Sequence, residues 1–305
     1  MSKKRLTTSR DLPGLRAVGL FEAAYNQANL DNTRAMRILR RNGELANGFA
    51  KLLTDLAMSS WYADEELNSE CLYSEKYHGP RPIDEQITAL AAIFNFDHSH
   101  ALKLAKHLPE LPHGAEGWFA VLDWKQTALT YCEVLEKVLA AIKSKRNFFN
   151  HQDGRLGAEY LRQHARTTIM LQKFRDQCNQ LVGGGIIIVP AQLGMWHRGR
   201  SVRRSHAVFA RHEFGLDAVA VGSILLTHPE LQTRWEHLQI DCAGNEYALG
   251  NDGGWQLAPS FHFASSLKFG VRLYNFADKR YGSATGFLPP RQQPQSPRRN
   301  HVQRR

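Results

Sequence analysis

Hydrophobic positions repeat at helical spacing through the first third of the chain. Leu45, Phe49, Leu52, Leu53 and Leu56 recur four, seven, eight and eleven positions after the first, which is one stripe of an amphipathic helix. The stretch from residue 59 to residue 82 follows neither the helical nor the strand period. The pattern predicts a mostly helical region up to about residue 112, with helices within residues 18–30, 34–56, 83–94 and 99–108.

From Gly117 onward the pattern mixes both periods. Three glycines precede the continuous apolar run Ile186–Val189, which is typical of a buried strand. The run at 216–226 is too uniformly apolar for the period to separate helix from strand. We expect long helices at 131–149 and 158–181, a short helix at 202–211, and strands at 118–124, 238–242, 260–263 and 269–276. The fold class is therefore α+β, with a helical N-terminal region followed by long helices packed on a mixed or antiparallel sheet.

Charge divides the chain further. The net charge is +10, but residues 1–16 hold five Lys/Arg and one Asp, and residues 289–305 hold five Arg and no acid. The body between these ends is nearly neutral, so the ends can bind polyanions weakly or serve solubility alone. The expected organisation is a basic flexible arm at 1–16, a helical region at 17–112, an α+β domain at 113–288 and a disordered basic tail at 289–305.

The densest candidate site is an arginine-rich loop that we expect directly after the Ile186–Val189 strand. Guanidinium groups match phosphate oxygens, and neighbouring aromatic rings can stack on bases. The structural alternative is that these arginines pair with acidic residues elsewhere in the chain. The predicted anion-binding residues are Arg198, Arg200, Arg203 and Arg204 for charge, with Trp196 and His197 for stacking.

A weaker candidate lies at the predicted strand 238–242. Strand alternation places His237 and Asp241 on one face and Cys242 on the other, so the thiol faces away from the groups that would activate it. His237 and Asp241 are the catalytic candidates, as an acid/base pair; exposed polar residues on a strand are the structural alternative. No His or Cys spacing is typical of a metal site, and we expect neither a metal nor a cofactor.

Together these features favour a protein that binds nucleic acid or another polyphosphate through the arginine-rich loop. One alternative is an enzyme of unassigned reaction that holds an anionic substrate there. Another is a structural or assembly protein whose helices at 18–56 and 131–181 supply surfaces for a protein partner. No apolar run approaches the length of a membrane helix, and residues 1–10 lack the apolar core of a secretory signal. We therefore expect a cytoplasmic protein without a membrane partner.

Overall fold

The computed structural model describes residues 10–59, 61–177, 182–250 and 254–289. The chain forms two compact units, Met1–Ser60 and Trp61–Arg305. The boundary comes well before the one expected near residue 112, because the helices α4 (Ile83–Phe94) and α5 (Ser99–Ala105) pack on the sheet of the second unit. The tail expected from Pro289 lies outside the described residues except for Pro289 itself.

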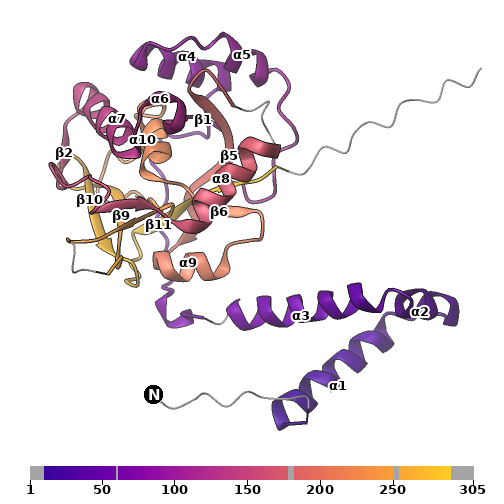
Figure 1. Ribbon diagram of the computed structural model, residues 1–305. Helices are drawn as coiled ribbons and strands as arrows, with labels where there is room; N and C mark the ends of the chain where they lie inside the picture. Colours follow the sequence, from indigo (N-terminus) through magenta and orange to yellow (C-terminus); the bar gives the residue numbers. More distant parts are fainter. Residues whose placement is uncertain (1–9, 60, 178–181, 251–253, 290–305) are drawn as a thin grey trace, which may run out of the picture. The chain divides into compact units, whose positions relative to one another are not determined.

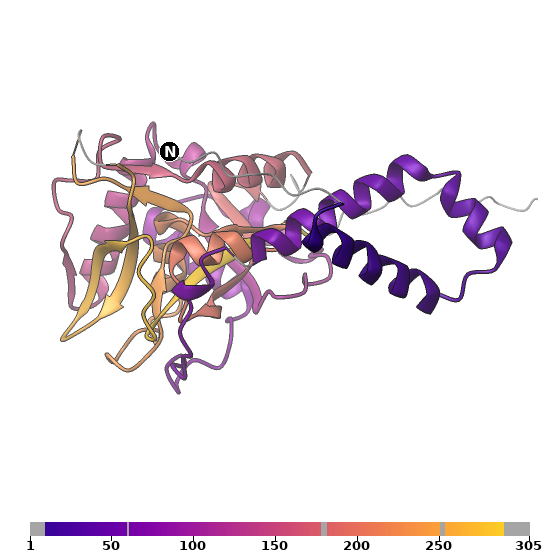
Figure 2. The ribbon, with the colours of Figure 1, turned by 90° about the horizontal axis from the view of Figure 1, so that it is seen from below.

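The first unit consists of helices in its described part: α1 (Leu12–Gln27), α2 (Asn32–Leu39) and α3 (Asn42–Ser59). The Asp31 side chain caps α2 by accepting a hydrogen bond of 2.8 Å from the backbone N–H of Arg34. The single helix expected at 34–56 is interrupted before Asn42 and Gly43, two residues with low helix propensity. α1 and α3 run back along each other with α2 at the turn (Figures 1 and 2). Since α1 begins at Leu12, the end of the arm expected at 1–16 is helical.

The second unit is built on one mixed sheet, which confirms the α+β fold class. Along its main path the strand order is β1-β5-β11-β7-β9-β10-β2, with β3, β4, β6 and β8 paired beside it. The pairs β11–β7 and β10–β2 are parallel and the others are antiparallel. The strands are β1 (Gly117–Leu122), β2 (Phe148–Asn150), β3 (Leu161–Gln163), β4 (Val182–Gly183), β5 (Ile186–Arg198), β6 (Glu213–Gly215), β7 (Gln239–Asp241), β8 (Asn245–Tyr247), β9 (Leu257–Phe263), β10 (Leu267–Leu273) and β11 (Tyr281–Phe287).

Two differences from the expected elements bear on the site. β5 continues to Arg198, so half of the expected arginine-rich loop is strand, and Arg198 itself pairs with Gly282 of β11. The helix expected at 158–181 begins only at Ala165, because Leu161–Gln163 pairs with β8 as a strand. β11 was not expected at all, although it lies near the middle of the sheet.

One face of the sheet is apolar and carries helices. α7 (Tyr131–Lys145) and α10 (Ala218–Thr227) lie side by side there (Figure 1), and Gly222 of α10 fits against Val138 of α7 and Phe261 of β9. Every residue of α10 is buried, and the run at 216–226 that the sequence left undecided is thus a helix. The remaining elements of this unit are η1 (Ala63–Glu65), α6 (Trp124–Thr127), α8 (Ala165–Gln177) and α9 (Val202–Val208).

The opposite face of the sheet is polar and also buried. Register pairs Gln192 with Thr285 and Ser283 with Asp241, and paired residues share a face. All four side chains have no exposed surface. Buried polar groups need hydrogen-bond partners, so this face can hold ordered side-chain networks. In the described residues no helix is both long and apolar enough to cross a membrane.

Candidate functional site

The arginine-rich segment lies at the end of β5 and the start of α9. Ser201 caps α9 by accepting a hydrogen bond of 2.9 Å from the backbone N–H of Arg204, which fixes the direction of the chain there. Glu66 forms two ion pairs, with Arg200 at 2.8 Å and with Arg204 at 3.0 Å. Glu65 pairs with Arg203. The structure brings the predicted arginines together, and carboxylates from residues 65 and 66 meet them.

Further contacts bind these guanidinium groups to the segment that begins at Trp61. Arg204 donates a hydrogen bond of 2.9 Å to the carbonyl oxygen of Trp61, and Arg198 donates one of 3.2 Å to that of Cys71. The guanidinium of Arg203 lies 4.0 Å from the ring centroid of Tyr62. The arginines thus hold residues 61–71 against the sheet. A phosphate would have to replace these partners, and anion binding by this segment stays a prediction.

The ion pairs of Glu66 make stability depend on pH. Hydrogen bonding from Arg200 and Arg204, opposed by desolvation, lowers the pKa of Glu66 below its ordinary value of 4.5. The carboxylate therefore contributes stability above pH 4.5, and the contribution disappears as the pH falls below that value. We expect Glu66→Gln to cost about 1 kcal/mol at pH 7, a small value because the pair is partly exposed. Thermal melts should show this difference shrinking toward pH 3; an equal difference at every pH would contradict the assignment.

The two predicted stacking residues have different surroundings. Trp196 is 54% exposed, and its ring lies edge-on to His113 with centroids 5.6 Å apart. His197 has no exposed surface. The prediction that His197 stacks on a base is corrected, because strand alternation turns its ring into the protein, where it meets Glu213.

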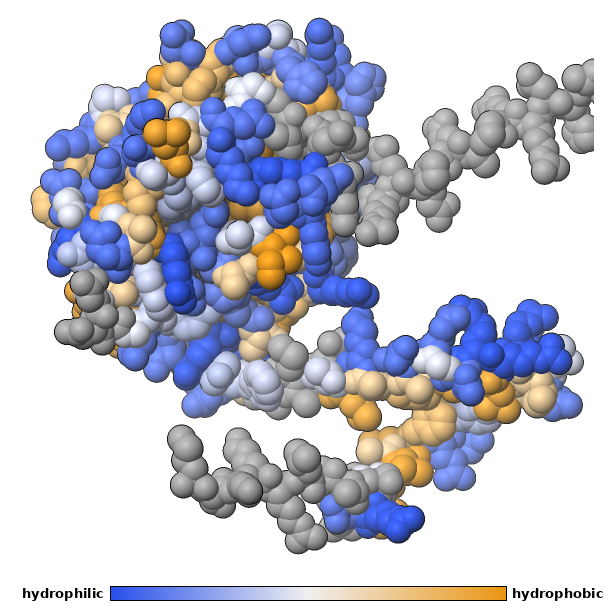
Figure 3. Space-filling view, viewed as in Figure 1, coloured by the Kyte–Doolittle hydropathy of each residue, from blue (hydrophilic) through white to orange (hydrophobic). Residues whose placement is uncertain are grey.

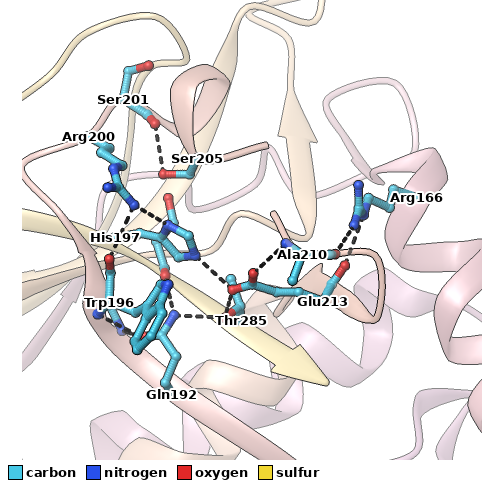
Figure 4. A network of polar contacts seen from close by, with 12 residues as sticks. Arg166, Gln192, Trp196, His197, Arg200, Ser201, Ser205, Ala210, Glu213 and Thr285 are labelled. Carbon is cyan, nitrogen blue, oxygen red and sulfur yellow. Dashed lines mark hydrogen bonds and ion pairs between the residues drawn. The ribbon is translucent and has the colours of Figure 1, made fainter. Parts of the chain in front are cut away.

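His197 and Glu213 form the centre of a buried polar network (Figure 4). Arg200 approaches Nδ1 of His197 at 3.0 Å, and since an arginine can only donate, Nδ1 accepts. Nε2 then carries the hydrogen that points to Glu213 Oε1 at 2.7 Å. The network connects the arginine-rich segment to the polar face of the sheet.

Glu213 collects its hydrogen bonds from separate elements. Thr285 of β11 donates to Oε1 at 2.7 Å, and the backbone N–H of Ala210 donates to Oε2 at 2.9 Å. Gln192 of β5 donates in turn to the Thr285 hydroxyl at 2.8 Å. Desolvation raises the pKa of Glu213, but the hydrogen bonds from His197, Thr285 and Ala210 outweigh it and hold the pKa below its ordinary value. The result is a buried carboxylate stabilised by convergent donors.

Sequence reasoning missed this network. Its members come from three strands and from the loop before β6, and no local spacing connects them. His197 and Glu213 are 16 positions apart, and Thr285 follows 72 positions later. Only the pairing of β5, β6 and β11 brings them together.

The catalytic candidates His237 and Asp241 do not form a pair. Asp241 lies on β7 with no exposed surface and pairs with Arg272 at 3.0 Å. Burial raises its pKa to about 6 in spite of that arginine. His237 lies four positions before Asp241 and outside β7, and its Nδ1 lies 3.5 Å from the Thr233 hydroxyl. The expected acid/base pair is therefore corrected, whereas Cys242 does face the apolar core as the strand pattern predicted.

His237 instead lines an open cavity of about 560 Å³, a volume within the range of small-molecule sites. Burial lowers the pKa of His237. The charged groups around it are mostly acidic, which gives the cavity no preference for an anionic substrate. The lining residues are Asn68, Glu70, Cys71, Leu72, Tyr73, Glu75, Glu236, His237 and Lys279.

In the described part of the chain no three His, Cys, Asp or Glu side chains are grouped as a metal site would require.

Comparisons with known proteins identify no relative. No family model matches the chain, and no curated protein or solved structure is significantly similar to it.

Proposed function

We propose that this protein is an assembly protein that associates with a second copy of itself through the apolar surface of α1–α3. The observation that supports it is the burial of this unit: between residues 10 and 54, none of the side chains whose exposure is described is buried. Helices of this length are marginal in water, and most of their stability comes from packing an apolar face. α1–α3 therefore lack a core of their own.

The unburied surface is apolar. Hydrophobic side chains gather along the facing sides of these helices (Figure 3), where Phe21 of α1 meets Phe49 of α3 with ring centroids 4.5 Å apart. Such surfaces on soluble proteins commonly mark association sites. In α1–α3, the described large hydrophobic side chains that are 41–74% exposed are Leu15, Val18, Leu20, Phe21, Tyr25, Met36, Leu39, Leu52 and Leu53.

Area and charge favour a second copy as the partner. Nine large apolar side chains, each about half exposed, offer an area on the order of the 800 Å² that each partner buries in a standard interface. Residues 10–59 carry seven Lys/Arg and five Asp/Glu, so two copies repel each other little. Two helical hairpins that join their apolar faces form a four-helix bundle, and twofold association is the commonest form of self-assembly.

The test is the molar mass of the full chain by size-exclusion chromatography with light scattering. We expect a dimer, twice the 34.6 kDa of one chain. A double variant with Leu20→Glu and Leu53→Glu should be a monomer, because it places charges on the apolar surface. These leucines are 74% and 59% exposed and belong to the first unit, so the change leaves the core of the second unit intact.

Leu129→Glu is the matched control, because Leu129 is a 93% exposed leucine in the second unit. This variant should keep the dimer mass. A wild-type chain that stays monomeric at micromolar concentration would contradict self-association and would leave the surface to another protein or to the second unit. A dimer that survives the double variant would contradict the assignment to α1–α3.

Polyanion binding is the second candidate, and one observation supports it outside the arginine-rich segment. Arg37 and Arg40, on and directly after α2, form no ion pair with any described residue, in contrast to Arg34 and Arg41. Unpaired cations on an exposed helix are available to phosphates. Arg200, Arg203 and Arg204 are already in ion pairs. The guanidinium groups of Arg37 and Arg40 are therefore more accessible to the phosphates of a nucleic acid.

A further inference from the structure

The two edge strands of the main sheet path, β1 and β2, differ in whether side chains satisfy their outward backbone groups. At β1, the side-chain amide of Gln86 accepts from the backbone N–H of Ala120 at 3.0 Å and donates to the carbonyl of Trp118 at 3.1 Å. The hydroxyl of Ser223 accepts from the N–H of Leu122 at 3.2 Å. These side chains take the place of a neighbouring strand. The β1 edge is thus closed to pairing with another chain.

The β2 edge has no such cover. Leu267 of β10 donates to the carbonyl of Asn147 at 3.3 Å, and His151 donates to the carbonyl of Phe269 at 2.9 Å. Since alternate residues of a strand face opposite neighbours, the backbone groups of Phe148 and Asn150 point away from β10. No described residue forms a hydrogen bond with them. They present unpaired donors and acceptors of the kind that an added strand requires.

A groove of about 520 Å³ runs beside this edge, between α7 and the turn that follows β2. The buried side chains of Leu139, Phe148 and Leu156 give it an apolar floor. Its charged groups are Glu136, Asp153 and Lys143, and none of these forms an ion pair with a described residue. The groove therefore combines an apolar floor with a small excess of negative charge.

We propose that β2 and this groove bind an extended segment of a partner protein by strand addition. The segment pairs its backbone with Phe148 and Asn150. Apolar side chains on one side of it fill the groove over Leu139 and Leu156. A basic side chain meets Glu136 and Asp153, so the preferred segment alternates apolar and polar residues and carries lysine or arginine. Backbone pairing supplies affinity in this mode, and the groove supplies selectivity.

The experiment selects a phage library of random linear octapeptides on the full-length chain and on two variants. Asn150→Pro removes the outward N–H without touching a hydrogen bond to β10, since proline is tolerated on edge strands. Ala140→Arg fills the groove from the exposed face of α7 and leaves the β2 backbone unchanged. Asn150→Ala is the matched control, because it loses the same side chain and keeps the N–H.

Peptides enriched on the wild type should alternate apolar and polar residues with at least one lysine or arginine. Their affinity should fall at least tenfold on Asn150→Pro and on Ala140→Arg, and should hold on Asn150→Ala. Methylating alternate backbone nitrogens of a selected peptide should abolish binding. The proposal is overturned if no peptide prefers the wild type to Ala140→Arg, or if backbone methylation leaves the affinity unchanged.

Discussion

Replacing Glu213 with alanine should lower the free energy of unfolding of the second unit by about 3–5 kcal/mol, because three buried donors lose their acceptor and each unsatisfied group costs about 1–3 kcal/mol. Glu213 is 2% exposed and accepts from His197, Thr285 and the N–H of Ala210. The substitution leaves these three donors buried without an acceptor, and each unsatisfied group costs stability. Denaturant unfolding followed by tryptophan fluorescence would measure the loss.

Glu110→Ala provides the matched control, because Glu110 is exposed and forms no ion pair with a described residue. Its effect should stay within about 0.5 kcal/mol, as for most surface substitutions. A loss below about 1 kcal/mol for Glu213→Ala would mean that water replaces the carboxylate easily. The network would then contribute little to the stability of the polar face of the sheet. Because the arginine-rich segment joins this network at Arg200, the same variant should loosen that segment.

Elements with a strong local signal were predictable. The helix expected at 83–94 is α4 (Ile83–Phe94), whose buried residues Ile87, Leu90 and Ala91 recur three and four apart. The run Ile186–Val189 is indeed strand, because four consecutive apolar residues can be buried on both faces of a sheet. In both cases the pattern of apolar residues within about a dozen positions, periodic in α4 and continuous in β5, carries the whole signal.

Elements that depend on distant pairing were not predictable. β11 has the sequence Tyr-Gly-Ser-Ala-Thr-Gly-Phe, and its small polar residues show no apolar stripe. It is nevertheless buried from Gly282 to Phe287, because it pairs with β5, β6 and β7. Its polar side chains face a polar layer, and only the fold creates that layer. The local sequence pattern therefore fails to predict a strand of this kind.

The candidate site shows the same limit for charge. The density of arginines at 198–204 indicated a gathering of guanidinium groups, which the structure has. The sequence could not show that Glu65 meets Arg203 across 138 positions, or that Glu66 meets Arg204 across the same separation. Charge density is local, whereas its neutralisation depends on tertiary contacts. The sequence likewise could not show that the apolar side chains of α1–α3 are exposed, because exposure depends on what the fold packs against them.

Replacing Gly282 with alanine should destabilise the second unit by about 4 kcal/mol, more than the 1–3 kcal/mol of ordinary overpacking. A methyl group on Gly282 would overlap the carbonyl oxygen of Gly194, and one on Gly194 would lie 2.7 Å from the carbonyl oxygen of Gly282. The backbones of the paired strands β5 and β11 come close at these two glycines, next to a shift in their register. The obstacle is backbone, which cannot rotate away as a flexible side chain does.

Ser283→Ala makes a matched comparison at the next residue of β11. The Ser283 hydroxyl is buried without a hydrogen-bond partner among the described residues. Removing it should change the free energy of unfolding by no more than about 1 kcal/mol, and we expect the change to be an increase in stability. Equal effects of the two variants would contradict the close approach of β5 and β11. A large effect of Gly282→Ala alone would locate the constraint in that backbone contact. The same pairing holds Gln192 opposite Thr285, and these two side chains are donors in the Glu213 network.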